Sequence, residues 1–396
     1  MRNRLLALGL AVLAAVAIAP PATAAPAAKT ALGTLPAPTG RSQVGTASLR
    51  LVDEAREDPW VPGRKRELMV SAWYPTRDAG RIPVAPQMQP AAAAHFDTFA
   101  GPENYGVPSG TADWASVRTS GHLDAAVARS GRLPVILFSP GAVDPRTFGT
   151  TDVEDLASRG YLVITIDHTY EASEVAFPGG RLETSRLREI LAQTTDITAL
   201  LTKIVAVRVA DTRFVLDALG QLAHGHNPDA DDRRLPSGLI GAPDLARVGM
   251  YGHSGGGFTA LQTMHDDGRI KAAANLDGQL SYGLEDDGTA LSTVASDGLN
   301  RPFLLIGSAP GGDHTKRPSW RALWNNSHGL RIDRTLPGSG HGSLTDAEAL
   351  LPRLAAQGAL PADVVTKHIG AADPATTIAT QRAWLASFFD QTLRSR

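Results

Sequence analysis

The stretch from Arg247 to Leu261, RVGMYGHSGGGFTAL, places a serine between glycines in the pattern Gly252-His253-Ser254-Gly255-Gly256. A strand-like run precedes this G-x-S-x-G pattern and a helix-like run follows it. In that setting a sharp turn presents a serine hydroxyl above the edge of a sheet, and glycines on either side relieve backbone clashes. The pattern predicts that Ser254 is a nucleophile, although a bare G-x-S-x-G also occurs by chance in glycine-rich turns.

A serine nucleophile needs a histidine base, and a carboxylate holds that histidine in turn. In enzymes built around this kind of turn, the carboxylate and then the histidine follow the serine along the chain. His341 fits this order, because it lies in a Gly/Ser loop after a strand-like segment, LRIDRTLPGSGHGSLTD. His253 lies inside the turn and is interpreted as shaping it, whereas His168 comes too early in the chain.

Two aspartates compete for the role of the acid. Asp313 follows the strand-like PFLLIG, which is where many enzymes of this kind carry the carboxylate, but it lies in a glycine-rich loop typical of a solvated side chain. Asp277 directly follows the buried-strand run AAANL, so it is rigidly placed at the carboxyl edge of the sheet, where such folds bind their ligands. Loop chemistry favours Asp277.

The negative charge that develops on the substrate oxygen needs two backbone N–H donors. Gly255, the residue after the nucleophile, supplies one. The other comes from the loop after an early strand, and FSPGA ends such a strand, so Ala142 is the candidate, with Gly141 allowing close approach. His224 and His226 lack suitably spaced partners for a metal. We therefore expect catalysis without a metal or cofactor.

These residues need a scaffold, and the sequence predicts an α/β fold in which a mostly parallel central sheet carries helices on both faces. The predicted single domain spans 44–396, with a helical insertion at about 170–241. Two early segments, ASLRLV and RELMVSAWYP, are predicted antiparallel edge strands. Thr151 and Glu154 fit a capping box that begins a helix. The other expected elements are buried strands at Val135–Phe138, 161–167, Arg247–Tyr251, Ala272–Leu276 and Phe303–Ile306, a helix over 197–219, and a final helix burying Leu385, Phe388 and Phe389.

The first residues have the features of an export signal. Arg2 and Arg4 precede an apolar run from Leu5 to Ala19, and the small-residue site Ala22-Thr23-Ala24 follows. Pro20-Pro21 ends the run short of the length needed to span a membrane. We expect cleavage near Ala24, a secreted protein that is extracellular or periplasmic, and a flexible N-terminus over 25–43.

Composition narrows the function classes. The chain has 396 residues, 43% of them hydrophobic and 20% charged, which is ordinary for a globular protein. Its formal net charge is −2 and it has no long basic run, so nucleic acid is excluded as an expected partner. The chain has no cysteine, so no disulfide contributes to its stability. Its oligomeric state is not predicted.

Several segments occur in an order that resembles a known family: LPVILFSPGA, DLASRGYLVITIDHT, VGMYGHSGGGFTALQTM, AAANLDGQL and GSGHGSLTD. They are similar to α/β-hydrolases of the platelet-activating factor acetylhydrolase type, the lipoprotein-associated phospholipase A2 group, with bacterial lipase and polyesterase relatives. The resemblance implies a Ca²⁺-independent serine hydrolase and nominates Asp277 as the acid. One departure is Pro140-Gly141, where the animal enzymes have His-Gly.

The resemblance implies a small-molecule or lipid ester substrate, with short or oxidised acyl chains of phospholipids preferred. Cleavage of triglycerides or polyesters with the same residues is the alternative, and a non-catalytic binding module or an acyltransferase also uses this fold. The stretch ITALLTKIVAV is apolar over much of its circumference. That pattern fits a helix buried in the core, and it also fits transient contact of the site's mouth with a lipid surface.

Overall fold

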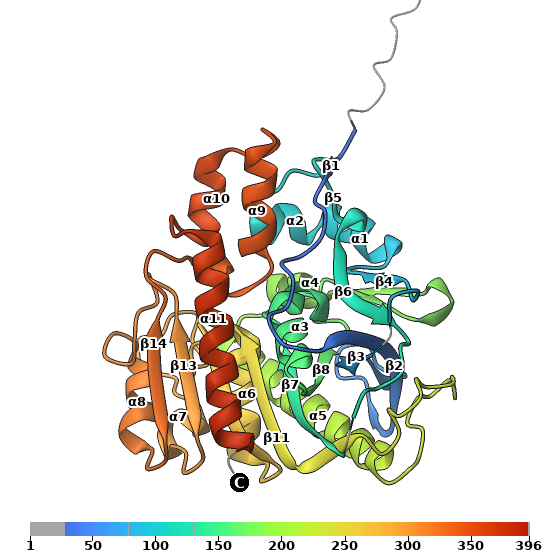
Figure 1. Ribbon diagram of the computed structural model, residues 1–396. Helices are drawn as coiled ribbons and strands as arrows, with labels where there is room; N and C mark the ends of the chain where they lie inside the picture. Colours follow the sequence, from blue (N-terminus) through green and yellow to red (C-terminus); the bar gives the residue numbers. More distant parts are fainter. Residues whose placement is uncertain (1–27, 78, 130, 395–396) are drawn as a thin grey trace, which may run out of the picture.

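The computed structural model describes residues 28–77, 79–129 and 131–394, so the predicted export signal lies outside the described residues. A ten-stranded sheet runs through the molecule (Figure 1), in the order β14-β13-β12-β11-β7-β8-β3-β2-β6-β4. The six strands from β14 to β8 are all parallel, and β3 pairs antiparallel with both β8 and β2. The predicted mostly parallel sheet is confirmed. Its strands are β2 (Gln43–Glu57), β3 (Lys65–Thr76), β4 (Val84–Pro86), β6 (Arg118–Leu123), β7 (Leu133–Ser139), β8 (Leu162–Asp167), β11 (Pro243–His253), β12 (Ile270–Leu276), β13 (Phe303–Gly307) and β14 (Arg331–Thr335).

Helices cover both faces of the sheet, as the sequence predicts. The strand residues alternate between the two faces: Val135 and Leu137 pack with α5 and α6, whereas Ile136 and Phe138 pack with α3 and α11. Leu385, Phe388 and Phe389 of α11 are buried, as expected. The helices of these layers are α3 (Thr150–Ser158), α5 (Ile197–Ala223), α6 (Gly255–Asp266), α7 (Thr293–Asp297), α8 (Pro318–Asn326) and α11 (Pro374–Phe389).

Six further elements form a second cluster beside the carboxyl edge of the sheet (Figure 1). They are α1 (Pro90–Thr98), α2 (Ala100–Tyr105), α9 (Ala347–Ala356), α10 (Ala362–Ile369) and the two-stranded pair β1 (Thr30–Ala31) and β5 (Ala112–Asp113). Within 170–241, the sheet-packed α5 is preceded by the hairpin of β9 (Glu174–Ala176) and β10 (Leu182–Thr184) and by α4 (Leu187–Gln193). Among the described residues, no helix is long and apolar enough to cross a membrane.

Three local predictions are wrong. β2 and β3 are interior strands, because β6 and β4 extend the sheet beyond them. α3 begins at Thr150 without a side-chain cap, and Glu154 is buried, where it accepts a hydrogen bond from the N–H of Ser120. The segment predicted to be flexible is anchored at two positions, because Leu32 and Leu35 are each only 2% exposed and bury their side chains in the second cluster.

Candidate active site

Ser254 lies in the turn between β11 and α6 with φ 52° and ψ −121°. This conformation is strained for a non-glycine residue, by on the order of 1–3 kcal/mol. A Cβ at Gly252 would lie 2.3 Å from the carbonyl carbon of Gly256, and one at Gly256 would lie 1.9 Å from the carbonyl oxygen of Ser139. The steric reason predicted for the two glycines is therefore confirmed.

Asp277 follows β12 directly, and its carboxylate receives hydrogen bonds on both oxygens. Oδ2 lies 2.5 Å from Nδ1 of His341 and accepts from the Ser308 hydroxyl at 2.8 Å. Oδ1 accepts from the Ser308 N–H at 2.9 Å and from Arg317 at 2.6 Å. Burial alone raises the pKa of Asp277, but the hydrogen bond with His341 and the charge of Arg317 outweigh it and lower that pKa. Asp277 is thus a rigidly held carboxylate beside His341.

Asp313, the alternative acid, is bonded elsewhere. Its Oδ1 accepts from the backbone N–H of Thr315 at 2.8 Å and from the Thr315 hydroxyl at 2.5 Å, which lowers the pKa of Asp313. These are the bonds of a local turn. The structure therefore brings His341 together with Asp277 and places Asp313 in a separate turn.

One cavity of about 590 Å³ brings the predicted residues together: Ser254, Asp277, His341, Ala142 and Gly255 all line it. The His341 side chain is 53% exposed, whereas that of Asp277 is 2% exposed. His341 thus faces the open cavity, and Asp277 lies enclosed behind it. Leu201, Ile204 and Val205 of ITALLTKIVAV also line this cavity, together with Phe258 of α6.

The two predicted oxyanion donors are close to one another. The nitrogen of Ala142 lies 3.6 Å from the point that a Cβ on Gly255 would occupy. The next residue, Val143, has φ 56°, which is a genuine outlier for a β-branched side chain. The loop that carries Ala142 is therefore strained, and other contacts must hold it in place.

His253 supports the loop that carries the predicted base. Its Nε2 lies 3.1 Å from the carbonyl oxygen of His341, and the two imidazole rings have centroids 4.5 Å apart. Burial, with a smaller contribution from the nearby His341, lowers the pKa of His253 to about 3, so this ring is neutral. A neutral ring whose Nε2 donates to a carbonyl positions its neighbour.

A smaller cavity of about 270 Å³ shares Ala142, Ser254 and His341 with the first. Its other side chains are mostly polar: Asn104, Tyr105, Asp144, His253, Lys367 and His368. Two cavities thus meet at the serine, and such a site can hold the two halves of an ester in separate spaces.

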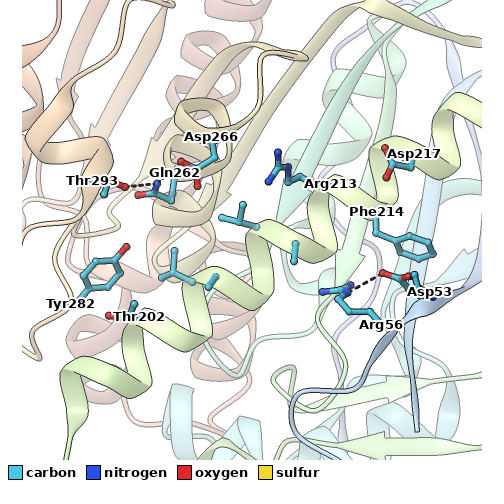
Figure 2. Close-up of a pocket in the computed structure, with 15 residues that line it drawn as sticks. Asp53, Arg56, Thr202, Arg213, Phe214, Asp217, Gln262, Asp266, Tyr282 and Thr293 are labelled. Atoms are coloured by element: carbon cyan, nitrogen blue, oxygen red, sulfur yellow. Dashed lines mark hydrogen bonds and ion pairs between the residues drawn. The ribbon is translucent and has the colours of Figure 1, made fainter.

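A third cavity of about 600 Å³ runs along α5 (Figure 2). Val205 lines both this groove and the catalytic cavity. Phe258 lines the catalytic cavity and Tyr282 lines the groove, and their ring centroids are 5.4 Å apart. These three side chains form a wall between the two spaces.

Within the part of the chain that the structure describes, one group has the composition of a metal site. Ligand atoms of Asp313, His314 and Asp333 lie within 4.8 Å of one another. However, Nδ1 of His314 lies 2.5 Å from Oδ2 of Asp333, and the His314 ring stacks on Trp324. These hydrogen bonds and the stacking account for the cluster, and we assign no cofactor to it.

Two arginines beside the site, Arg208 and Arg317, are not predicted by the sequence motifs. Arg317 donates to Oδ1 and to the backbone carbonyl of Asp277, and Arg208 donates to the loop before Ala142. Arg208 is a charged residue within the apolar run of α5, and this pattern could have indicated a buried cation with a specific partner. Arg317 lies in a polar loop, where no local pattern distinguishes it.

The fold and the site together define an α/β-hydrolase. Residues 107–360 match the family described as platelet-activating factor acetylhydrolase, isoform II. Because this match covers more than half of the chain, the chain belongs to that family. The predicted family and fold class are confirmed.

Individual relatives are esterases. The chain is 29% identical over 335 residues to a probable 1-alkyl-2-acetylglycerophosphocholine esterase of Arthroderma benhamiae, covering 80% of this chain and 77% of the relative. It is 25% identical over 178 residues to the platelet-activating factor acetylhydrolase of Canis lupus familiaris, covering 41% and 39%. A ferulic acid esterase from Streptomyces cinnamoneus has a similar structure, with TM-score 0.72, 34% identity and coverage of 92% and 94%. The chain is a carboxylic ester hydrolase.

Proposed function

We propose that the protein hydrolyses esters through an acyl-enzyme on Ser254. The Ser254 hydroxyl attacks the ester carbonyl carbon while His341 takes its proton. The N–H groups of Ala142 and Gly255 stabilise the oxyanion, and His341 returns the proton to the departing alcohol. Water activated by His341 then attacks the acyl-enzyme and releases the acid. The observation that carries this proposal is the 2.5 Å contact between His341 and Asp277 in the cavity that Ser254 lines.

Covalent labelling tests the nucleophile. An aryl organophosphonate should modify the wild-type protein at one residue, and peptide mass spectrometry should locate the adduct on Ser254. Ser254→Ala should remove both labelling and hydrolysis of p-nitrophenyl acetate. Stoichiometric labelling of a folded Ser254→Ala variant would assign the nucleophile to another residue.

For the substrate, we propose short or oxidised acyl esters, with sn-2 acetyl groups of glycerophosphocholines included. The likeness to the Arthroderma esterase supports this class, and the wall formed by Val205, Phe258 and Tyr282 supports a short acyl chain. Esters of phenolic acids are a second candidate, supported by the 34% identity with the ferulic acid esterase.

A substrate panel distinguishes these classes. We expect a higher kcat/KM for p-nitrophenyl acetate than for the palmitate, and turnover of a dispersed 1-alkyl-2-acetylglycerophosphocholine. Faster cleavage of the palmitate would favour a lipase, and a preference for methyl ferulate would favour the second candidate. The sequence of residues 1–24 also leads us to propose secretion, which N-terminal sequencing of the exported protein tests.

A further inference from the structure

Arg208 is a buried cation directly beneath the loop that follows β7. It lies in the middle of α5 and is 1% exposed. Its Nη1 donates to the carbonyl oxygen of Pro140 at 2.8 Å, and its Nη2 donates to that of Gly141 at 3.3 Å. A single guanidinium thus donates to two adjacent peptide units of one loop, and the Gly141 carbonyl oxygen also accepts from the N–H of Asp144 at 3.3 Å.

The remaining edge of the guanidinium is also occupied. Nε of Arg208 donates to Oε2 of Glu171 at 2.7 Å, and Oε1 of Glu171 accepts from the indole N–H of Trp60 at 3.2 Å. Glu171 is fully buried. Because a guanidinium is planar and its donors form a rigid fork, Glu171 fixes the plane from which Arg208 reaches the two carbonyls.

The carbonyl of Gly141 and the N–H of Ala142 belong to the same planar peptide unit. A bond that fixes the direction of this carbonyl therefore also fixes the direction of the Ala142 N–H. Donation from a cation to the carbonyl also polarises the peptide, which makes its N–H a stronger donor. This restraint matters here because the following residue, Val143, has a strained positive φ.

We propose that Arg208 is the positioning residue of the oxyanion-binding peptide, acting through the carbonyls of Pro140 and Gly141 to hold the Ala142 N–H toward the transition state. This inference rests on the proposed function, in which Ala142 is an oxyanion donor. It goes further because it makes the orientation and the hydrogen-bond strength of that N–H depend on Arg208, a side chain of α5.

The test compares Arg208→Lys with a matched control. Lysine keeps the charge, but its single ammonium group cannot reproduce the planar fork. Arg382→Lys is the control, because Arg382 is also buried and donates to three backbone carbonyls, those of Pro36, Ala37 and Thr151. With p-nitrophenyl acetate we expect kcat to fall by about 10²-fold in Arg208→Lys, the order expected for a lost or misaligned oxyanion donor. KM should change little, and Arg382→Lys should keep wild-type kcat.

A second readout separates alignment from general damage. Ethylboronic acid forms a tetrahedral adduct with an active-site serine and places a boronate oxygen where the oxyanion lies. Its inhibition constant should rise in Arg208→Lys by about the same factor as kcat/KM falls. A loss of kcat with unchanged boronate affinity would assign Arg208 a different role.

If Arg208→Lys does not fold, the double variant Arg208→Met with Glu171→Gln removes both buried charges together, so that neither is left unpaired. It should show the same parallel loss of kcat/KM and boronate affinity. Wild-type values for both quantities in either folded variant would overturn the positioning role alone. A wild-type protein without esterase activity would overturn the proposed function as well.

Discussion

Replacement of Asp277 by asparagine tests the acid most directly, because the hydrogen bonds around this residue dictate how the amide must turn. Oδ1 accepts from the Ser308 N–H and from Arg317, so the amide oxygen must take that position. The NH₂ group then faces the Ser308 hydroxyl and Nδ1 of His341. The hydroxyl can rotate and accept, but the imidazole must lose its Nδ1 proton.

The consequence is the wrong tautomer. With Nδ1 as an acceptor, the proton of His341 moves to Nε2, the nitrogen that has to accept the proton of Ser254. In triads of this kind the same substitution lowers kcat by about 10⁴-fold with the geometry intact, which corresponds to about 5.4 kcal/mol of transition-state stabilisation. We expect a loss of this order for Asp277→Asn.

Asp313→Asn is the matched control. The Asp313 carboxylate accepts hydrogen bonds from Thr315 within its own turn, so kcat/KM of the variant should stay within about threefold of wild type. The assay is hydrolysis of p-nitrophenyl acetate, with circular dichroism and thermal unfolding to show that both variants are folded. Asp277 is not the acid if folded Asp277→Asn keeps a tenth of the wild-type kcat/KM, or if folded Asp313→Asn loses about 10⁴-fold of it.

Four further predictions concern other parts of the molecule. Gly256→Ala should lower the free energy of unfolding, measured by urea titration, by about 3 kcal/mol or more, because the new Cβ would lie 1.9 Å from the Ser139 carbonyl oxygen. The control is Gly268→Ala, where the Cβ meets nothing within 4 Å, and its free energy of unfolding should stay within about 0.5 kcal/mol of wild type. Arg317→Gln removes a positive charge beside Asp277 that favours the deprotonated form of the site. The acidic limb of the pH profile of kcat/KM should therefore move to higher pH. An unchanged limb would mean that the charge of Arg317 does not affect the ionisation on which kcat/KM depends. Tyr282→Ala opens the wall between the catalytic cavity and the groove along α5, so the ratio of kcat/KM for p-nitrophenyl octanoate to that for the acetate should rise about tenfold, whereas Tyr282→Phe should leave it unchanged. Burial raises the pKa of Glu154 from 4.5 to about 8, so this carboxyl contributes stability that is fully present below pH 4.5 and is lost as the pH rises through about 8. Between pH 5 and pH 8, the fall in the free energy of unfolding measured in urea should therefore be smaller in Glu154→Gln than in wild type, by at least about 1 kcal/mol. Parallel pH profiles of the two proteins would contradict this.

The sequence predicts the central features of the fold because their signals are local. A run of apolar residues buried on both faces of a sheet is continuous in the chain, and β7, β12 and β13 each satisfy that pattern. The motif around Ser254 is also local in the chain, although its steric cause is only partly so: a Cβ at Gly252 would meet Gly256, whereas a Cβ at Gly256 would meet Ser139 of β7. Steric requirements of this kind can therefore be recognised from the spacing of the glycines in the sequence.

The errors come from contacts that are distant in sequence. Glu154 fits a capping box within its own helix, but its carboxyl group accepts a hydrogen bond from the N–H of Ser120 on β6. The segment before β2 looks flexible by composition, yet the cluster around α9 buries Leu32 and Leu35. Local propensity is outweighed wherever tertiary burial provides a partner that the local pattern does not contain.

The same distinction explains which parts of the site the sequence predicts. Ser254 and His341 each follow a strand, so their positions can be derived from element order. Element order alone favours Asp313 as the acid, and loop chemistry together with the family resemblance is needed to favour Asp277. Arg208 is different, because a cation within the apolar run of α5 fits a solvated helix face as well as a buried contact. Only the packing of α5 against the loop after β7 places its guanidinium on the carbonyls of Pro140 and Gly141. Chain order thus indicates the nucleophile and the base, whereas the residues that position them become visible only in the packing. A search for positioning residues in related chains should begin with charged side chains inside apolar helices.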